Sequence, residues 1–237
     1  MKLTDAELAA LSLAAERGQI SADQAIQLTL AQCATDGLFW LKWVKTRDEA
    51  DPAVTLKPFP LQLEYVRELW TVLQSSQRVV VAKSRQMLVS WVAAAFCLWT
   101  ARFKENQACY WQSQQWDEAV EKVCMPTGGF MGRIQFMERH LPEWMRQNVK
   151  ESEGRIQFPN GSIVQSLAGG ADKARGKTFS LFIADEFAHQ EDQRGVFLTV
   201  MPLIQKGAKA VFISTPNGTA NEFCTIYHGR YVGTEAL

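Results

Sequence analysis

The sequence lacks an excess of charge of either sign, because 25 Lys and Arg residues are balanced by 25 Asp and Glu residues. Non-specific affinity for nucleic acid comes chiefly from neutralising backbone phosphates, so this chain is not expected to coat a polyanion by bulk charge. Local clusters of basic residues can still contact nucleic-acid phosphates, although each cluster can equally be a solvated surface. Two groups qualify: Arg133, Arg139, Arg146, Lys150 and Arg155, and Lys173, Arg175 and Lys177.

Long apolar runs are also missing, since no uninterrupted stretch reaches 18 residues and no membrane-spanning helix is expected. The N-terminus carries Asp5, Glu7 and Glu16 and lacks the basic start and apolar centre of a signal peptide. With 47% apolar residues in a chain of 237, a sizeable core can be buried. The expectation is one cytoplasmic α/β domain with an additional helical piece and no contact with a membrane.

Metal-binding patterns of cysteine and histidine are absent, because the five cysteines show no C-x-x-C spacing and the three histidines are scattered. His189 lies three residues past Glu186, in a region of interest described below, but a surface role is favoured for it. The cysteines are expected to be reduced core residues. They are Cys33, Cys97, Cys109, Cys124 and Cys224.

Four apolar residues, Leu181 to Ala184, run directly into two carboxylates, Asp185 and Glu186. The apolar run predicts a buried strand, and open α/β sheets bind ligands at the carboxyl ends of such strands. Of two adjacent carboxylates, one can hold a metal ion while the next orients a water molecule. The alternative is an Asp that caps a following helix.

A second apolar strand, Val79 to Ala82, breaks into a polar loop before an Ala-rich stretch over Trp91 to Phe103. That stretch is apolar almost all round, which predicts a helix buried against a sheet. A loop that feeds a helix N-terminus offers unpaired N–H groups and the positive end of the helix dipole to a phosphate. Lys83 and Arg85 add positive charge, and Ser90 places a hydroxyl where P-loop enzymes ligate Mg²⁺.

This loop has no glycine between Val79 and Trp91, and Val89 occupies the lysine position of a standard G-x-x-x-x-G-K-[ST] loop. Either the site is inactive or structural, or the lysine has moved to the front of the loop at Lys83. The segment resembles the deviant Walker A of tailed-bacteriophage terminase large subunits, ATPases that pump DNA into procapsids, in which the lysine opens the loop and Ser or Thr closes it. It consists of Lys83, Ser84, Arg85, Gln86, Met87, Leu88, Val89 and Ser90, with Leu88 where the family usually has a small residue.

Three further segments match the same family in the same order. Pro58 to Gln62 resembles the adenine-side motif, in which Gln62 could hydrogen-bond to an adenine edge. The alternative is an ordinary loop that leads to a helix. Arg175, in an Arg-Gly pair, precedes the strand that begins at Leu181. It could act as an arginine finger toward a phosphate, contact DNA, or simply lie in a solvated turn. Val211 to Gly218 is a third strand ending in a polar turn, and it resembles the coupling motif that senses the γ-phosphate through hydroxyls, here Ser214 and Thr215.

The resemblance implies an ASCE-type P-loop NTPase fold, with a mainly parallel sheet flanked by helices over residues 58–237 and a helical lead-in over residues 1–57. In the lead-in, Ser21 followed by Gln24 predicts a capping box. Alternation of period two on both sides of a turn at Pro159 to Gly161 predicts an antiparallel hairpin. The nuclease domain of the family is expected to be absent, and with it nuclease activity.

The resemblance also implies ATP and Mg²⁺ as cofactors. Ser90 and Asp185 would hold the metal, Glu186 would orient or deprotonate the attacking water, and Lys83 and Arg85 would neutralise phosphate charge. Nucleotide contacts are expected from Gln62, from the loop 83–90, and from Ser214 and Thr215.

The partners implied are double-stranded DNA, the portal protein and the terminase small subunit, in the host cytoplasm. A homo-oligomeric ring, a pentamer, is expected on the portal and a monomer in isolation. Two other functions stay open: a helicase-like P-loop ATPase acting on nucleic acid, and an assembly module whose P-loop has decayed.

Overall fold

The computed structural model describes residues 13–14, 17–18, 20–47, 56–85, 87–125 and 132–229. The first part of the expected helical lead-in falls mostly outside these ranges, and Gln86 of the loop also lies outside them. Among the residues described, no helix is both long enough and apolar enough to cross a membrane.

A seven-stranded sheet organises the fold, in the spatial order β3-β9-β8-β4-β7-β6-β5. Pairing is parallel from β3 through β7 and antiparallel for the last two strands. The expected mainly parallel sheet is therefore confirmed. The strands are β3 (Arg78–Ala82), β4 (Ala108–Gln112), β5 (Lys150–Ser152), β6 (Arg155–Gln157), β7 (Ile163–Leu167), β8 (Leu181–Ala184) and β9 (Lys209–Ser214).

Both faces of the sheet are covered, and alternate residues of one strand join different cores. In β9, Val211 and Ile213 lie in one apolar cluster, whereas Ala210 and Phe212 lie in the other. All four are fully buried. A strand buried on both faces must be apolar at every position, which is why this segment reads as a continuous apolar run without alternation.

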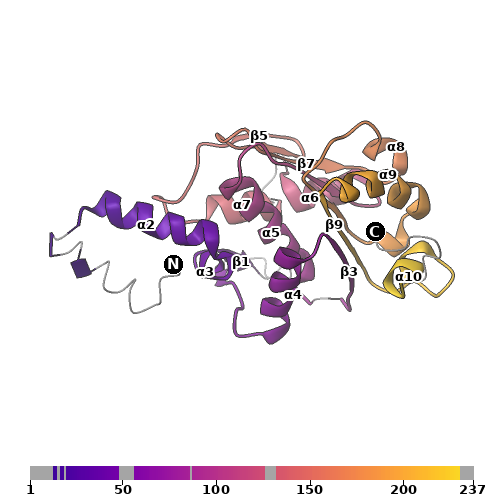
Figure 1. Ribbon diagram of the computed structural model, residues 1–237, viewed down its shortest axis with the longest axis horizontal. Helices are drawn as coiled ribbons and strands as arrows, with labels where there is room; N and C mark the ends of the chain where they lie inside the picture. Colours follow the sequence, from indigo (N-terminus) through magenta and orange to yellow (C-terminus); the bar gives the residue numbers. More distant parts are fainter. Residues whose placement is uncertain are drawn as a thin grey trace.

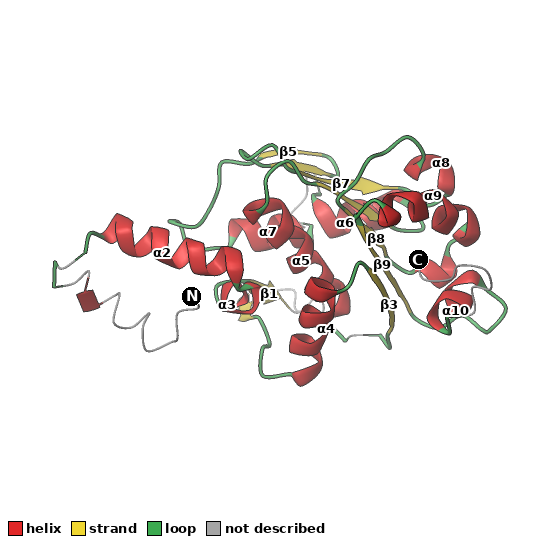
Figure 2. Cartoon of the chain, viewed as in Figure 1, coloured by secondary structure: helices red, strands yellow, loops and turns green. Residues whose placement is uncertain are grey.

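The helices divide between the two faces, as Figures 1 and 2 show with the strands between them. One face carries α3 (Gly37–Leu41), α4 (Glu64–Ser75), α5 (Val89–Phe103), α6 (Trp116–Val123) and α7 (Arg133–Arg139). The other carries α8 (Ala171–Ala174), the 3₁₀ turn η1 (Phe187–His189), α9 (Gln193–Gln205) and α10 (Glu222–Tyr227).

In the lead-in the structure gives the bounds of α2 (Ala22–Thr35). Its capping box is present as the sequence predicts, because Ser21 and Gln24 exchange side-chain to backbone hydrogen bonds. The rest of this segment is not purely helical, because β1 (Lys45–Arg47) pairs with β2 (Leu56–Pro58). Trp40 of α3 is fully buried, with its ring centroid 6.3 Å from that of Trp70 in α4. The end of the lead-in thus packs into the same core as the helices that follow.

The predicted hairpin is confirmed as β6 and β7, and its turn has a second structural role. Asn160 in the turn donates through Nδ2 to the carbonyls of Ala101, Arg102 and Lys104. These are among the last carbonyls of α5, which have no partner within the helix. The hairpin turn therefore caps the C-terminus of α5, and β5 extends the sheet beyond what the sequence indicated.

Candidate nucleotide-binding site

The site lies at the carboxyl ends of three neighbouring strands. Lys83 follows β3, Ser214 ends β9, and Asp185 follows β8. Because β9 lies between β3 and β8, the two strands that carry the lysine and the acids are one strand apart, so their side chains meet over the end of β9. The backbone N–H of Lys83 donates to the carbonyl of Ser214 at 2.9 Å, which extends the ladder to the start of the loop.

Lys83 and Glu186 meet directly, although they are 103 residues apart in sequence: Nζ donates to Oε1 at 2.6 Å. The lysine side chain is only 11% exposed and the glutamate side chain 37%, so the pair is partly shielded from water. The convergence of the lysine at the front of the loop with the paired acids is the arrangement expected from the sequence.

Glu186 is held on its other side by Thr215. Oε2 accepts from the Thr215 hydroxyl at 3.2 Å and from the Thr215 N–H at 3.4 Å. Burial alone would raise the pKa of Glu186, but the Lys83 ammonium and the Thr215 donors outweigh burial and place the pKa below its ordinary value. The residue is therefore an ionised acceptor at neutral pH.

His189 extends this chain of contacts, because its Nε2 lies 2.9 Å from Oγ1 of Thr215. The expectation of a surface role is half right: the ring is exposed, yet it contacts a residue of the site. The turn η1 sets this position, since the Ser214 hydroxyl accepts from the N–H of Ala188 at 3.0 Å. Of the two coupling-motif hydroxyls, only that of Thr215 reaches Glu186.

Asp185 is 1% exposed and faces the start of α5. Its Oδ2 accepts from the Ser90 hydroxyl at 3.2 Å, and its Oδ1 accepts from the N–H of Glu186 at 3.0 Å. Burial raises the pKa of Asp185, opposed by the positive charges of Lys122, then Lys83. Lys122 was not singled out from the sequence, because 63 residues separate it from Asp185 and no local pattern joins them.

The raised pKa of Asp185 makes this residue costly for stability at neutral pH. The folded state holds the proton more tightly than the unfolded state, so the free energy of unfolding falls as pH rises from the ordinary carboxyl range through the raised pKa. We expect Asp185→Asn, without nucleotide, to melt at a higher temperature than the parent at pH 7, with the difference shrinking toward acid pH. Calorimetry across pH tests this, with exposed Asp172→Asn as control; a lower melting temperature at pH 7 would contradict it.

The loop carries the backbone features expected of a phosphate cradle. The N-cap of α5 is Leu88, in the left-handed conformation at φ 55°, and no side chain caps the first N–H groups of the helix. Left-handed backbone costs a non-glycine residue about 1–2 kcal/mol, which explains why a small residue is favoured at this position. Glu186 shares this conformation at φ 47°. Among the described residues, a third non-glycine residue with positive φ, Asn106, lies away from the site between α5 and β4.

The remaining predicted residues are placed as follows. Ser84, Arg85 and Met87 are exposed in the loop, and Val89 is buried. Gln62 is exposed in the loop before α4 and hydrogen-bonds none of the described site residues, so its adenine role stays a prediction.

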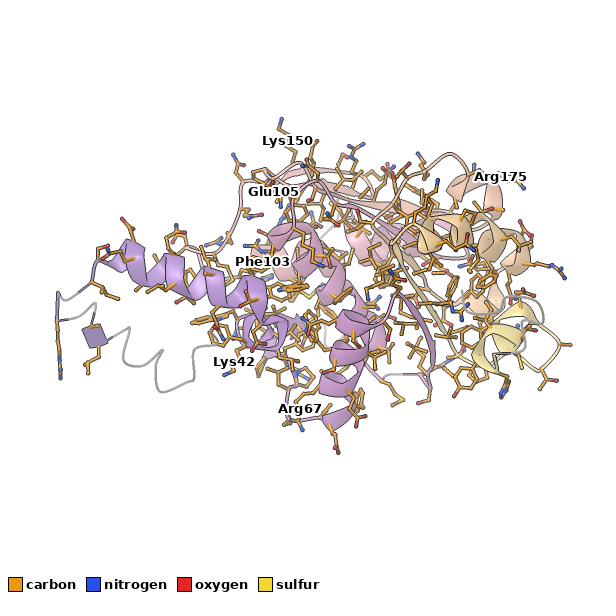
Figure 3. The ribbon with its side chains drawn as sticks, viewed as in Figure 1. Lys42, Arg67, Phe103, Glu105, Lys150 and Arg175 are labelled. Carbon is orange, nitrogen blue, oxygen red and sulfur yellow. The ribbon has the colours of Figure 1, made fainter. Side chains whose placement is uncertain are left out.

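The two candidate basic patches are only partly available for contacts. Arg133 is 7% exposed and lies over the Trp91 ring at 5.8 Å. Arg139 is paired with Glu151. Arg175, at the outer edge of the molecule in Figure 3, is paired with Asp172 at 2.8 Å. Contact with DNA stays a prediction for both groups.

The residues present fit a magnesium ion. Mg²⁺ prefers oxygen ligands and typically takes one or two from protein, the rest coming from phosphate and water. Ser90 Oγ and Asp185 Oδ2 supply two such oxygens 3.2 Å apart. Within the described residues, no group of three or more His, Cys, Asp and Glu side chains forms a closed metal site. If this pair held the ion, the remaining ligands would have to come from phosphate and water.

Comparison with known proteins gives one family and one fold. Residues 81–234 match the family model described as terminase large subunit, T4likevirus-type, N-terminal. Similar solved structures include the large terminase of a thermophilic bacteriophage, with TM-score 0.54 and 15% identity over 70% of this chain and 42% of that chain. The same large terminase in complex with ADP has a TM-score of 0.51 and is 14% identical, over 71% of this chain and 42% of that chain.

The large terminase of bacteriophage HK97 is also similar, with TM-score 0.54 and 14% identity over 83% of this chain and 40% of that chain. The chain thus spans 40–42% of the length of these relatives, and at such identities the likeness shows the fold alone. That fold is the P-loop NTPase fold of terminase ATPase domains. Because the family model covers well over half of the sequence, the chain belongs to the terminase large subunit family, T4likevirus-type, and corresponds to its N-terminal part.

Proposed function

We propose that this chain is a Mg²⁺-dependent ATPase whose hydrolysis of ATP drives double-stranded DNA into a procapsid. One observation carries the proposal: Lys83, which opens the P-loop, and Glu186, which follows the β8 strand, meet at 2.6 Å beside the Ser90–Asp185 contact. Phosphoryl transfer needs a cation for the phosphates, oxygen ligands for a metal ion and a carboxylate that orients water, and these residues supply all three. The ADP complex of the thermophilic-phage large terminase supports a nucleotide as the ligand.

Each residue has a role in the proposed reaction. Lys83 and the free N–H groups at the start of α5 neutralise phosphate charge. Ser90 and Asp185 would hold Mg²⁺, which would supply charge stabilisation to the phosphoryl group that is transferred. Glu186, ionised at neutral pH, orients the attacking water or accepts its proton. The phosphates draw Lys83 away from Glu186, and the Thr215 bonds keep the carboxylate in place while this happens.

Thr215 also connects the site to neighbouring elements of the fold. Its hydroxyl lies 3.2 Å from Glu186 Oε2 and 2.9 Å from His189 Nε2, so a shift of the carboxylate after hydrolysis, once Lys83 is released from the phosphates, would alter both contacts. Thr215 follows β9, and His189 ends η1, so these contacts transmit the change to two elements. We propose this as the coupling between hydrolysis and movement of DNA.

The partners belong to the same proposal, supported by family membership. They are double-stranded DNA, the portal protein and the terminase small subunit, with a homo-oligomeric ring on the portal in the host cytoplasm. In such a ring a neighbouring subunit would supply an arginine to the site, so the isolated chain is expected to hydrolyse ATP slowly.

Replacement of Lys83 tests the proposal directly. We expect Lys83→Ala to bind ATP about tenfold or more weakly and to turn it over more slowly, because a charge-assisted bond to phosphate is lost. Binding is measured by calorimetric titration with Mg·ATP and turnover by phosphate release. Lys177→Ala, an exposed lysine in the turn after α8, is the matched control.

Three results would contradict the proposal in different ways. Equal ATP affinity in Lys83→Ala would assign the lysine function to another residue. A folded parent protein that binds no nucleotide at millimolar concentration would favour the assembly module with a decayed P-loop. DNA unwinding by the parent would favour the helicase-like alternative.

A further inference from the structure

A cavity of about 370 Å³ lies at the amino ends of β8 and β9, whereas the nucleotide site lies at the carboxyl ends of these strands. Its lining includes Leu181 and Lys209, the first residues of β8 and β9. Lys209 and Ser214 are the two ends of β9, so about 16 Å separates this cavity from the carboxyl ends of the strands. The cavity is therefore a separate site, and its volume falls within the usual range of small-ligand pockets.

Three lysines line the cavity, Lys104, Lys206 and Lys209, and no acidic residue does. The contacts made by two of them are to neutral groups. Lys209 Nζ donates to the carbonyl of Ser76 and lies 5.7 Å from the centre of the Phe96 ring. Lys104 Nζ lies 5.4 Å from the centre of the Trp99 ring. In the part of the chain that the structure describes, none of the three forms an ion pair with a carboxylate.

Helix capping explains only part of this charge. Lys104 is the C-cap of α5 and Lys206 is the C-cap of α9, positions where a cation complements the helix dipole. Each helix end carries about half a negative charge. Two ends therefore offset about one of the three positive charges, and the cavity keeps a net positive charge.

Two further observations indicate a missing anion. Thr100 is among the residues that line the cavity and is 5% exposed, and its hydroxyl oxygen is buried without a hydrogen-bond partner among the described residues. Burial, and then repulsion by Lys104, lower the pKa of Lys209 to about 8. A buried hydroxyl without a partner and a lysine crowded by another lysine are both unfavourable alone, and an acceptor anion would satisfy both.

We propose that this cavity binds a small phosphate-bearing anion, held by the ammonium groups of Lys104, Lys206 and Lys209 and by the Thr100 hydroxyl. A recess of this volume can hold a small ligand, whereas duplex DNA presents its phosphates on a convex surface. The proposal goes beyond ATP hydrolysis and does not depend on it, because none of these residues belongs to the nucleotide site.

Lys209 itself reports on occupancy. With a pKa of about 8, it is about half neutral at pH 8, whereas an ordinary lysine is almost fully charged. Its neutral amine should react with an acylating reagent, and peptide mass spectrometry measures the extent of acylation at Lys209. We expect inorganic phosphate, at constant ionic strength in chloride, to protect Lys209 in a saturable way, because a bound anion raises its pKa and covers it. The same protection is expected in Lys83→Ala, which separates this cavity from the nucleotide site.

Two variants and one control complete the test. In Lys104→Gln/Lys206→Gln the phosphate concentration for half protection should rise about tenfold or more. Thr100→Val should weaken protection while leaving the melting temperature unchanged or higher, since it removes an unsatisfied buried hydroxyl. Lys173→Gln/Lys177→Gln removes the same charge from exposed positions and should behave as the parent.

The same labelling experiment with a nucleoside diphosphate shows whether free phosphate or a nucleotide protects Lys209 at the lower concentration. Protection by either anion supports the site. Lys209 labelling that is insensitive to both anions overturns the proposal. So does equal protection in the parent and in Lys104→Gln/Lys206→Gln, and so does protection by duplex DNA alone.

Discussion

Glu186→Gln is expected to lower ATP turnover about 100-fold or more while leaving ATP affinity nearly unchanged. The amide keeps the size of the side chain and an oxygen for Lys83, but it can neither take a proton nor hold an attacking water by charge. In the folded protein the pKa of Glu186 lies below its ordinary value, so the carboxylate is the form lost by this substitution. Single-turnover phosphate release with saturating Mg·ATP measures the effect on the chemical step.

The matched control for this experiment is Glu191→Gln. Glu191 is exposed and lies five residues further along the chain, so its replacement removes the same charge from the same region. It should hydrolyse ATP at the parental rate. If Glu186→Gln also turned over at the parental rate, Glu186 would have no role in activating water, whatever its contact with Lys83.

Arg102→Met is expected to destabilise the fold by about 3–5 kcal/mol, because it leaves a buried charge without its partner. Arg102 of α5 pairs with Glu138 of α7, and the two side chains are 1% and 3% exposed. The same guanidinium donates to the carbonyl of Met145, while Glu138 accepts from the N–H of Gln147 at 3.0 Å. The pair therefore ties the P-loop helix to α7 and to the segment after it. Urea unfolding measures the loss.

Two further variants separate the ion pair from simple loss of packing. Arg102→Met/Glu138→Leu removes both charges and should recover most of the lost stability, as apolar replacements of buried pairs often do. Arg175→Met breaks a pair with Asp172 whose side chains are 68% and 85% exposed, and it should change stability by less than about 1 kcal/mol. A double variant as unstable as Arg102→Met would show that packing of the arginine, and not the uncompensated charge, dominates.

Local patterns in the sequence were sufficient for most of the framework. The strands before Lys83 and Asp185, the strand ending at Ser214 and the hairpin are where the apolar runs and turn residues place them. The capping box at Ser21 is present for the same reason. Such features depend on residues within a few positions of one another, and their physics is contained in that short range.

Other features had no local signal. The Arg102–Glu138 pair joins residues 36 positions apart, and neither stands out in its own helix. Strand β5 is three residues long and is stabilised by β6. The contact of His189 with Thr215 depends on η1 folding back beside the end of β9. The left-handed conformation of Leu88 was also hidden, because leucine rarely adopts it and the sequence signal for it is glycine.

The chemical groups of the site can be read from the sequence: a cationic loop between a strand and a buried helix, two acids after a second strand, and hydroxyls after a third strand. The position of β9 between β3 and β8, which brings Lys83 to Glu186 and Ser90 to Asp185, follows from the tertiary fold. The tertiary fold also places Lys104 beside the stretch from Lys206 to Lys209, so that two segments share one cavity at the amino ends of β8 and β9. The physical reason is that strand order follows from burying both faces of the sheet at once, which no single segment encodes.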